Sequence, residues 1–355
     1  MFNFVYKFYF MTYLVTGGSG FIGSHLIQQL LNVGHNVINV DSFDDFYDYR
    51  IKVTNTLESV ECNAEFKFKD KAHDINLLQQ IVNSQNYTLY NLDIQNKEGL
   101  SHVFKEHSID TVIHLAALAG VRPSIERPLD YAHTNIIGSM ILWEICREHG
   151  VMRVLNASSS SVYGNNSKVP FSEEEKVDTP ISPYAATKKS AEILSHVYYQ
   201  LYGISMIHLR FFTVYGPRQR PDLAIHKFTS LISSGTPIPF YGDGSTSRDY
   251  TYIEDIITGI LKAIHFIENN GAVYEILNLG ESETVTLEEM ITAIENELQL
   301  SAVKIKLPIP PGDVLMTNAN ISKARNLIDY SPRTKFQNGI KNFVEWFLKK
   351  SGKAN

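Results

Sequence analysis

The stretch at residues 16–23 constrains the fold of this chain most strongly, because three glycines recur in it at intervals of three. It follows a short apolar run at 13–15 and opens an amphipathic stretch at 21–31, a pattern that predicts a strand-to-helix turn. Residues without Cβ let backbone N–H groups reach phosphate oxygens and let helix press on strand. The spacing is G-x-x-G-x-x-G, wider than the G-x-G-x-x-G dinucleotide fingerprint.

A second apolar run at 35–40 ends in Asp41, 18 residues after Gly23. A carboxylate there accepts hydrogen bonds from ribose hydroxyls and repels a 2′-phosphate, which favours NAD over NADP. The turn and this strand therefore predict an NAD site. Its predicted lining residues are Gly17, Gly20, Phe21, Ile22, Gly23 and Asp41.

Composition bounds the partners. The chain has 355 residues, a hydrophobic content of 44% and a net charge of −6, which favour a substantial core and give no reason to expect nucleic acid or an anionic membrane as partner. Two cysteines, Cys62 and Cys146, are too few for a disulfide framework or a zinc site. They fit a reducing cytoplasm, and no metal site is expected.

The first ten residues are aromatic and apolar around Lys7, but no small-residue cleavage site follows them. We expect an extended or misassigned start before Met11; a short arm on the surface is the alternative. The sequence contains no run of about 20 uncharged apolar residues, so we expect no membrane span.

Apolar strands alternate with amphipathic helices up to about residue 212, which predicts a Rossmann-type, doubly wound parallel sheet in the α/β class. Residues 42–86 interrupt this rhythm, and there we expect a helix near 50–60 plus a mobile loop. From Thr213 prolines and glycines break the pattern and segments shorten. We expect an NAD-binding domain at 11–212, with return segments near 250–280, and a smaller discontinuous substrate lobe mainly at 213–350.

Two further strand ends are predicted to meet the cofactor. Asp93 and Ile94 follow a strand at 87–92; Asp93 either contacts the adenine amino group or caps the next helix. Ala116 and Ala117 follow a strand at 111–115, and their small size lets a cofactor pass close by.

Tyr184 and Lys188 are four residues apart on a helix that Ser182 and Pro183 are predicted to open. A tyrosine is a poor base at neutral pH, but an ammonium and a cationic nicotinamide nearby favour the phenolate. The serine run at 158–161 follows an apolar strand and supplies a hydroxyl to relay the proton. A half-buried tyrosine beside a solvated lysine, and an ordinary serine loop, are the alternatives.

These features together resemble the extended short-chain dehydrogenase/reductase family, and within it the UDP-glucuronate 4-epimerases. The resemblance runs from about residue 11 to 348 and rests on an ordered set of motifs. They are 16–23, 114–117, 157–164, Tyr184 with Lys188, 210–222, 242–244, 248–255 and 311–314.

The resemblance implies roles for individual residues. Tyr184 is the base, Ser159 its hydroxyl partner and Lys188 the holder of the nicotinamide ribose, while Asn135 and Asp93 line the NAD site. Arg122 and Arg248 would contact the pyrophosphate or form surface ion pairs; Tyr241 would flank uracil or belong to the core. The residues implied for substrate binding are Arg122, Ser160, Ser161, Thr213, Arg220, Tyr241, Arg248 and Asp313.

The family's chemistry is transient oxidation at C4 of a UDP-sugar. The resemblance also implies a homodimer and a role in making sugars for cell-surface polysaccharides. Sugar 4,6-dehydratases carry an Asp-Glu pair where this chain has Ser160 and Ser161, and UDP-glucuronate decarboxylases carry Glu at Ser161. Thr213 replaces the Asn usual in galactose-type epimerases, which favours a uronic acid. UDP-glucose and UDP-N-acetylglucosamine epimerases remain alternatives, as does a non-catalytic NAD-binding regulator.

Overall fold

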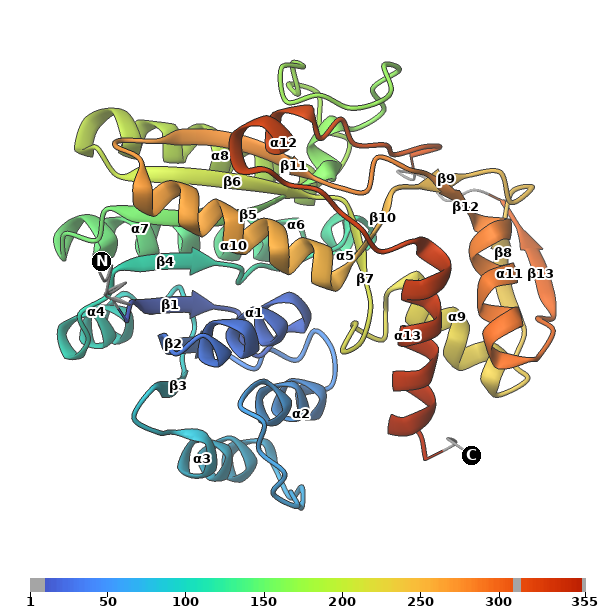
Figure 1. The fold of residues 1–355 in the computed structure, drawn as a ribbon, viewed down its shortest axis with the longest axis horizontal. Coiled ribbons are helices and arrows are strands. Elements are labelled where there is room, and N and C mark those ends of the chain that lie inside the picture. Colours follow the sequence, from blue (N-terminus) through green and yellow to red (C-terminus); the bar gives the residue numbers. More distant parts are fainter. Residues whose placement is uncertain (1–9, 309–313, 353–355) are drawn as a thin grey trace, which may run out of the picture. The chain divides into compact units, whose positions relative to one another are not determined.

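A seven-stranded sheet carries the fold and confirms the predicted doubly wound parallel sheet; β1 pairs in parallel with β2 and β4, β2 with β3, and β6 with β11. The order from β3 to β6 is that of the doubly wound dinucleotide-binding fold, with β11 added at one edge. In spatial order the strands are β11 (Tyr274–Leu279), β6 (Ser205–Phe211), β5 (Arg153–Ser159), β4 (Thr111–His114), β1 (Thr12–Thr16), β2 (Asn36–Asp41) and β3 (Tyr87–Asn91) (Figure 1).

The computed structural model describes residues 10–308 and 314–352. The chain divides into two compact units: unit 1 comprises the residues up to 116 with 141–154, and unit 2 comprises 117–140 with the residues from 155 onward. The division of ligand-binding roles at residue 213 stays a prediction.

Unit 1 holds β1 to β4 and the helices between them. Leu14 and Val15 of β1 and Leu26 and Ile27 of the following helix are fully buried, so the amphipathic stretch after the glycine turn packs as predicted. The helix expected near 50–60 is confirmed, but the predicted loop after it contains a second helix. The helices are α1 (Phe21–Asn32), α2 (Tyr49–Ser59), α3 (Lys71–Val82), α4 (Lys97–Glu106) and most of α7 (Ser139–Glu148).

Unit 2 contains the long helix α8 (Pro183–Tyr202), which forms where the sequence predicts it. The Ser182 hydroxyl accepts a hydrogen bond from the Ala185 N–H at its start, and Gly203 ends it in the left-handed conformation. Helix α10 (Ile253–Asn269), which sequence analysis left unassigned, buries a face of isoleucines. Unit 2 also contains the helical segments α5 (Val121–Glu126), α6 (Pro128–Ala132), the π-helical η1 (His133–Gly138), the 3₁₀ turn η2 (Ser160–Tyr163) and α12 (Ser322–Ile328).

Within unit 2, the short elements after β6 form the predicted smaller group. Three ladders of two strands each are present, and α11 packs on α9 and α13, as Figure 1 shows. The elements are β7 (Thr213–Tyr215), β10 (Tyr250–Tyr252), β8 (Ile238–Tyr241), β13 (Lys304–Leu307), β9 (Ser247–Arg248), β12 (Val285–Thr286), α9 (Ala224–Ser233), α11 (Leu287–Leu298) and α13 (Phe336–Lys350).

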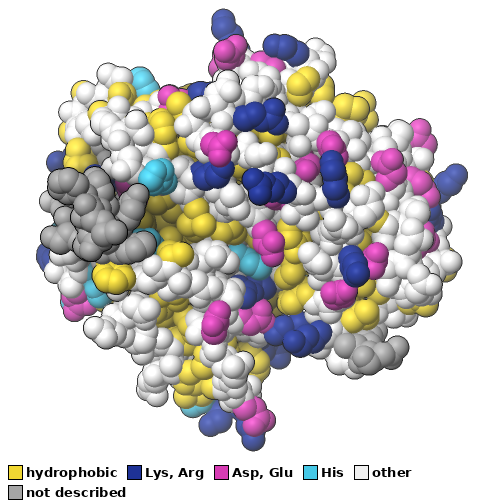
Figure 2. Space-filling view, in the orientation of Figure 1, with side chains coloured by type: hydrophobic (Ala, Val, Ile, Leu, Met, Phe, Trp, Pro, Cys, Tyr) yellow, Lys and Arg dark blue, Asp and Glu magenta, His cyan; other side chains and the backbone are white. Residues whose placement is uncertain are grey.

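The surface carries both signs of charge. Lys, Arg, Asp and Glu side chains lie intermingled on the face drawn in Figure 2, the distribution that dispersed basic residues produce. Across residues 10–308 and 314–352, every helix is too short or too polar to cross a membrane. The same residues contain no group of three or more His, Cys, Asp or Glu side chains arranged to hold a metal ion.

Candidate active site

The glycine turn of unit 1 leaves the start of α1 open to a ligand. Gly17 has a φ of +72°, and a Cβ on it would lie 2.8 Å from the Ala116 nitrogen, while a Cβ on Gly23 would meet the Gly17 carbonyl oxygen. Helix α1 begins after Gly20 with no side-chain cap and no acidic residue in its first turn. The partial positive charge of the helix N-terminus is therefore available to an anion such as a pyrophosphate.

Asp41 stands at the end of β2, where the sequence predicts the ribose contact. Its carboxylate accepts hydrogen bonds from the N–H groups of Ser19 at 3.1 Å and Phe43 at 2.8 Å, and the Lys52 ammonium lies 3.6 Å from it. A carboxylate has about four acceptor positions, so these contacts leave acceptor positions unused on a side chain that is 5% exposed. The turn and Asp41 together fit the adenosine and pyrophosphate parts of NAD.

The apolar residues predicted to line the cofactor differ in exposure. Phe21 and Ile94 are buried, whereas Ile22, Ala116 and Ala117 are half-buried. The first two therefore belong to the core, and the other three have surface to offer a ligand.

Asp93 follows β3 on the exposed surface. Its carboxylate accepts a hydrogen bond of 2.8 Å from the Gln95 N–H, and Asn96, not Asp93, caps α4 by accepting from the Gly99 N–H. The capping alternative for Asp93 is therefore wrong, because the chain makes one more turn before the helix begins. Contact with adenine stays a prediction.

Asn135 lies in η1 and uses its amide group within unit 2. Its oxygen accepts from the Leu118 N–H at 2.9 Å, and its nitrogen donates to the Leu118 carbonyl at 3.0 Å and the Thr187 hydroxyl at 3.1 Å. Asn135 therefore fixes the chain just after Ala117 to α8. Its role in the NAD site stays a prediction.

The three predicted catalytic residues come together in unit 2. Tyr184, from α8, is half-buried, and Ser159 at the end of β5 lies near enough to lower the pKa of its hydroxyl. Lys188 is buried one turn later; its ammonium donates to the Ala157 carbonyl at 2.8 Å and lies 6.0 Å from the centre of the Tyr184 ring. A phenol, a hydroxyl and an ammonium thus share one small region.

Burial and charge act on this group in opposite directions. Burial raises the pKa of the Tyr184 hydroxyl, while the Ser159 hydrogen bond and the charge of Arg220 lower it. Burial also lowers the pKa of Lys188 to about 8, against the opposing effect of Glu192. The sequence points to the lysine as the cation favouring a phenolate; the structure adds Arg220.

Arg220, whose charge acts on Tyr184, is held in place by Asp222. Its guanidinium pairs with Asp222, with N–O distances of 2.9 and 2.6 Å. The Tyr131 ring meets the Tyr184 ring edge-on at 6.2 Å, and the Arg220 charge also lowers the pKa of Tyr131, which burial raises to about 12. Arg220 is therefore a cation of the catalytic region in this structure.

The serine run continues after Ser159, the predicted partner of Tyr184. The Ser161 hydroxyl accepts from Ser159 at 3.0 Å, and the Ser161 N–H donates to the same Ser159 oxygen at 3.1 Å. Ser160 and Ser161 begin η2 and are half-buried. These positions therefore present hydroxyls, and no carboxyl group, after Ser159.

Of the residues predicted to contact the nucleotide, Tyr241 and Arg248 lie in the smaller group, and Arg122 lies in α5. The Arg122 guanidinium stacks 5.1 Å from the centre of the Tyr241 ring, and Arg248 donates to the Ser247 carbonyl at 2.9 Å. Thr213 begins β7 opposite Tyr250 of β10 and is half-buried. Asp313 lies outside the described residues.

Comparison with known proteins decides the family. The family described as GDP-mannose 4,6 dehydratase matches residues 14–343. The chain belongs to this family. Its members include the extended short-chain dehydrogenases/reductases that the sequence motifs resemble, so the predicted family is confirmed.

Several relatives of this family member are described as 4-epimerases. A UDP-glucuronate 4-epimerase of Thermodesulfobacterium geofontis is 39% identical over 335 residues, which are 94% of this chain and 95% of the relative. The crystal structure of UDP-glucuronic acid 4-epimerase from Bacillus cereus with UDP-glucuronic acid and NAD has 35% identity and a TM-score of 0.84, covering 96% of this chain and 100% of that one. A UDP-glucose 4-epimerase of Thermotoga maritima, solved with UDP-glucose, has 30% identity and a TM-score of 0.81, with coverages of 96% and 100%.

Sequence reasoning missed a buried ion pair next to the predicted catalytic residues of this extended short-chain dehydrogenase/reductase. Glu192, on α8 four residues after Lys188, and Arg210, on β6, are both 1% exposed and pair with each other. The spacing of Tyr184, Lys188 and Glu192 on one helix face could have pointed to the glutamate. Only the packing of β6 against α8 supplies its partner.

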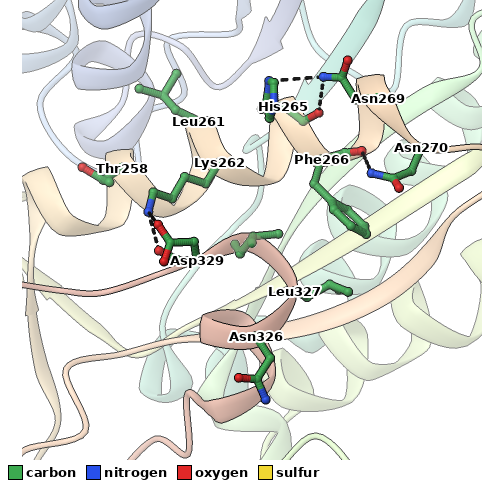
Figure 3. A pocket seen from close by; sticks show the side chains of 11 residues that line it. Thr258, Leu261, Lys262, His265, Phe266, Asn269, Asn270, Asn326, Leu327 and Asp329 are labelled. Atoms are coloured by element: carbon green, nitrogen blue, oxygen red, sulfur yellow. Dashed lines mark hydrogen bonds and ion pairs between the residues drawn. The ribbon is translucent and has the colours of Figure 1, made fainter.

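A separate pocket of about 580 Å³ lies between α10 and α12, as Figure 3 shows. Lys262 pairs with Asp329 there at 2.8 Å, and Asn269 bonds to His265. Its lining contains none of the predicted site residues, and its charged pair is satisfied internally. The pocket is therefore distinct from the catalytic region of this family member.

Proposed function

We propose that this NAD-dependent UDP-sugar 4-epimerase acts on UDP-glucuronate and interconverts it with UDP-galacturonate. The observation that carries this proposal is the grouping of Tyr184, Lys188 and Ser159, with Lys188 fixed to the Ala157 carbonyl at 2.8 Å, followed by hydroxyls rather than carboxyls at Ser160 and Ser161. The named relatives, two of which are UDP-glucuronate 4-epimerases, support the same substrate.

Tyr184 acts as the base in this proposal. Its phenolate takes the proton from the sugar O4, Ser159 shares that proton, and the Lys188 and Arg220 charges stabilise the phenolate. When bound, NAD would accept the C4 hydride and later return it, so no NAD is consumed overall. The same tyrosine returns the proton after the sugar ring has turned over about the pyrophosphate.

The carboxylate of the sugar needs its own binding groups. A 4-keto glucuronate is a β-keto acid, which loses CO₂ readily if its carboxylate is desolvated or turned out of plane. Ser160, Ser161 and Thr213 are the proposed donors that hold its charge and its plane. The absence of an acid pair at 160–161 argues against dehydration, and Ser161 in place of Glu argues against decarboxylation.

The nucleotide is the part that must be gripped firmly while the sugar turns. Arg122 and Arg248 are the proposed pyrophosphate contacts, because guanidinium groups match phosphate oxygens. Tyr241, stacked on Arg122, is proposed to flank the uracil, and Asp313 to accept from the uridine ribose. In this proposal residues 11–212, with 250–280, bind mainly NAD, and 213–350 bind mainly the UDP-sugar.

The competing substrates are UDP-glucose and UDP-N-acetylglucosamine, and the structural likeness to a UDP-glucose 4-epimerase keeps the first in view. The test is incubation of purified protein with each UDP-sugar, with products resolved by NMR. Formation of UDP-galacturonate from UDP-glucuronate as the fastest reaction supports the proposal. Faster turnover of a neutral sugar would move the assignment to that sugar, and turnover of none would favour the non-catalytic regulator.

We also propose a cytoplasmic homodimer that supplies sugars for cell-surface polysaccharides. An exposed apolar stripe on α8 supports the dimer: Ile193, Val197 and Leu201 recur every four residues and are 56%, 46% and 67% exposed. Ile137 of η1, which packs on α8, is 46% exposed as well. Large apolar side chains at helical spacing on one face are typical of a helix that packs on a second copy.

A further inference from the structure

A buried ion pair lies directly behind the catalytic residues. The Glu192 carboxylate accepts from Arg210 Nε and Nη2, both at 2.8 Å, in a two-pronged arrangement. Burial raises the pKa of Glu192, but the hydrogen bonds and charge of Arg210 outweigh it and bring the pKa to about 2. The arginine therefore favours the ionised form of the Glu192 carboxyl group.

The same carboxylate also holds the end of β5. The Ser158 hydroxyl donates to Glu192 Oε1 at 2.7 Å. Ser158 stands between Ala157, whose carbonyl accepts from Lys188, and Ser159, which lowers the pKa of the Tyr184 hydroxyl. Ala157 and Ser158, just before the Ser159 hydroxyl, are thus attached to α8 at two successive turns of the helix.

The pair extends this attachment to the next strands. Arg210 Nη1 donates to the Tyr163 hydroxyl at 2.9 Å, and that hydroxyl donates to Asn278 at 2.8 Å. Arg210 lies on β6 and Asn278 on β11, so one hydrogen-bonded chain joins α8, β5, η2, β6 and β11. A buried ion pair is weak support for stability, because removing two charges from water is costly. The pair therefore contributes mainly by fixing the relative positions of these elements.

We propose that Glu192, fixed by Arg210, is a positioning residue that sets the place of the Ser159 hydroxyl beside Tyr184 by holding Ser158. The inference rests on the proposed 4-epimerase function for its kinetic test. It predicts that loosening this attachment slows the chemical step more than it weakens binding of the UDP-sugar, because Glu192 acts on the reacting groups and not on the nucleotide.

Ser158→Ala is the sharpest test, because it removes the attachment and leaves the Glu192–Arg210 pair intact. We expect kcat on UDP-glucuronate to fall about 10- to 100-fold, the effect of a small misplacement of a reacting group, while KM stays within about twofold. Ser195→Ala is the matched control. Like Ser158, Ser195 is buried, but it lies on α8, and its hydroxyl donates to the Glu192 backbone carbonyl at 2.9 Å. It should lose similar thermal stability and keep the wild-type kcat. Equal kcat for wild type and Ser158→Ala would overturn the inference.

A second variant guards against misfolding by an unpaired buried charge. The double change Glu192→Met with Arg210→Met removes both charges at similar volume, which buried pairs often tolerate. We expect a folded protein that still carries NAD and has the same low kcat as Ser158→Ala. A folded double variant with wild-type kcat would show that the pair has a structural role alone.

A readout independent of turnover separates this inference from the proposed function. Tyrosine labelled with ¹³C at the ring carbon that bears the hydroxyl reports the titration of Tyr184 by NMR, with Tyr184→Phe to assign the signal. The groups that act on Tyr184 are Ser159, Arg220, Lys188 and Tyr131. Loss of the Ser159 hydrogen bond in Ser158→Ala should shift the titration upward, and an unchanged midpoint would contradict the inference even if no UDP-sugar were turned over.

Discussion

The Lys188 ammonium donates a 2.8 Å hydrogen bond to the Ala157 carbonyl oxygen. This contact keeps a buried cation near Tyr184 and ties α8 to the end of β5, two residues before the catalytic hydroxyl. A lysine whose pKa burial lowers to about 8 still carries its charge at neutral pH. The arrangement therefore couples the position of Ser159 to the charge that favours the Tyr184 phenolate.

Tyr184→Phe should abolish turnover while leaving NAD bound, because the ring still packs but cannot take the proton from O4. Loss of a general base costs about 10²–10⁴ in rate. The measurement is kcat on UDP-glucuronate together with the NAD released on denaturation. Tyr202→Phe, the same change at a largely exposed residue of α8, should leave both unchanged. Activity of Tyr184→Phe within about tenfold of wild type would contradict the assignment.

Asp41 should make the protein select NAD over NADP. Denatured wild-type protein should release close to one NAD per chain without any having been added. In Asp41→Asn the loss of charge opposite a 2′-phosphate should reduce the discrimination about tenfold or more, as measured by competition between the two cofactors. Asp44→Asn, an exposed change in the same loop, is the control. Unaltered discrimination in Asp41→Asn would mean that this carboxylate does not face the ribose.

Thr213→Ala should weaken catalysis on UDP-glucuronate about 10- to 100-fold, since a hydrogen bond to a charged group contributes about 1.5–3 kcal/mol. Any activity on UDP-glucose should change little. A looser carboxylate should also let some 4-keto intermediate lose CO₂, so a UDP-pentose by-product should rise. Product distribution by NMR or mass spectrometry checks both points. Thr258→Ala, at an exposed residue of α10, is the control. Equal losses on the two sugars would identify Thr213 as a general packing residue.

His208 should make the fold sensitive to acid. Burial lowers its pKa to about 4, so between about pH 6.5 and 4 the unfolded chain binds a proton that the native chain does not. Stability should therefore fall as the pH falls through this window, by up to about 3 kcal/mol. Denaturant unfolding at several pH values should show this contribution in wild type and its loss in His208→Gln. His265→Gln makes the same change at an exposed histidine. An identical pH dependence for wild type and His208→Gln would refute the prediction.

Leu201→Glu should convert the proposed dimer into monomers, because it puts a charge in the exposed apolar stripe of α8. Light scattering after gel filtration measures the mass. Leu300→Glu is the matched control, since Leu300 is also exposed but lies outside that stripe. A wild-type protein that is monomeric at micromolar concentration, or a Leu201→Glu variant that stays dimeric, would rule out this interface.

Local features of the chain were readable from its sequence. The glycine turn before α1 and the Ser182 cap of α8 depend on residues that are neighbours, so their spacing predicts them. The seven-stranded sheet followed from the alternation of apolar strands and amphipathic helices. The helix α3 was missed because its polar sequence carries a weak apolar period.

Contacts between distant residues were decided by the tertiary structure. Ser158 lies 34 residues before Glu192, and Arg210 lies 18 after it, yet all three meet in one buried cluster. Arg220 likewise acts on Tyr184 from a loop that no local pattern relates to α8. The sequence determined which residues could do the chemistry, through helix spacing and backbone geometry. Which charges surround them depends on how the strands pack against α8, because electrostatic contacts act through space rather than along the chain.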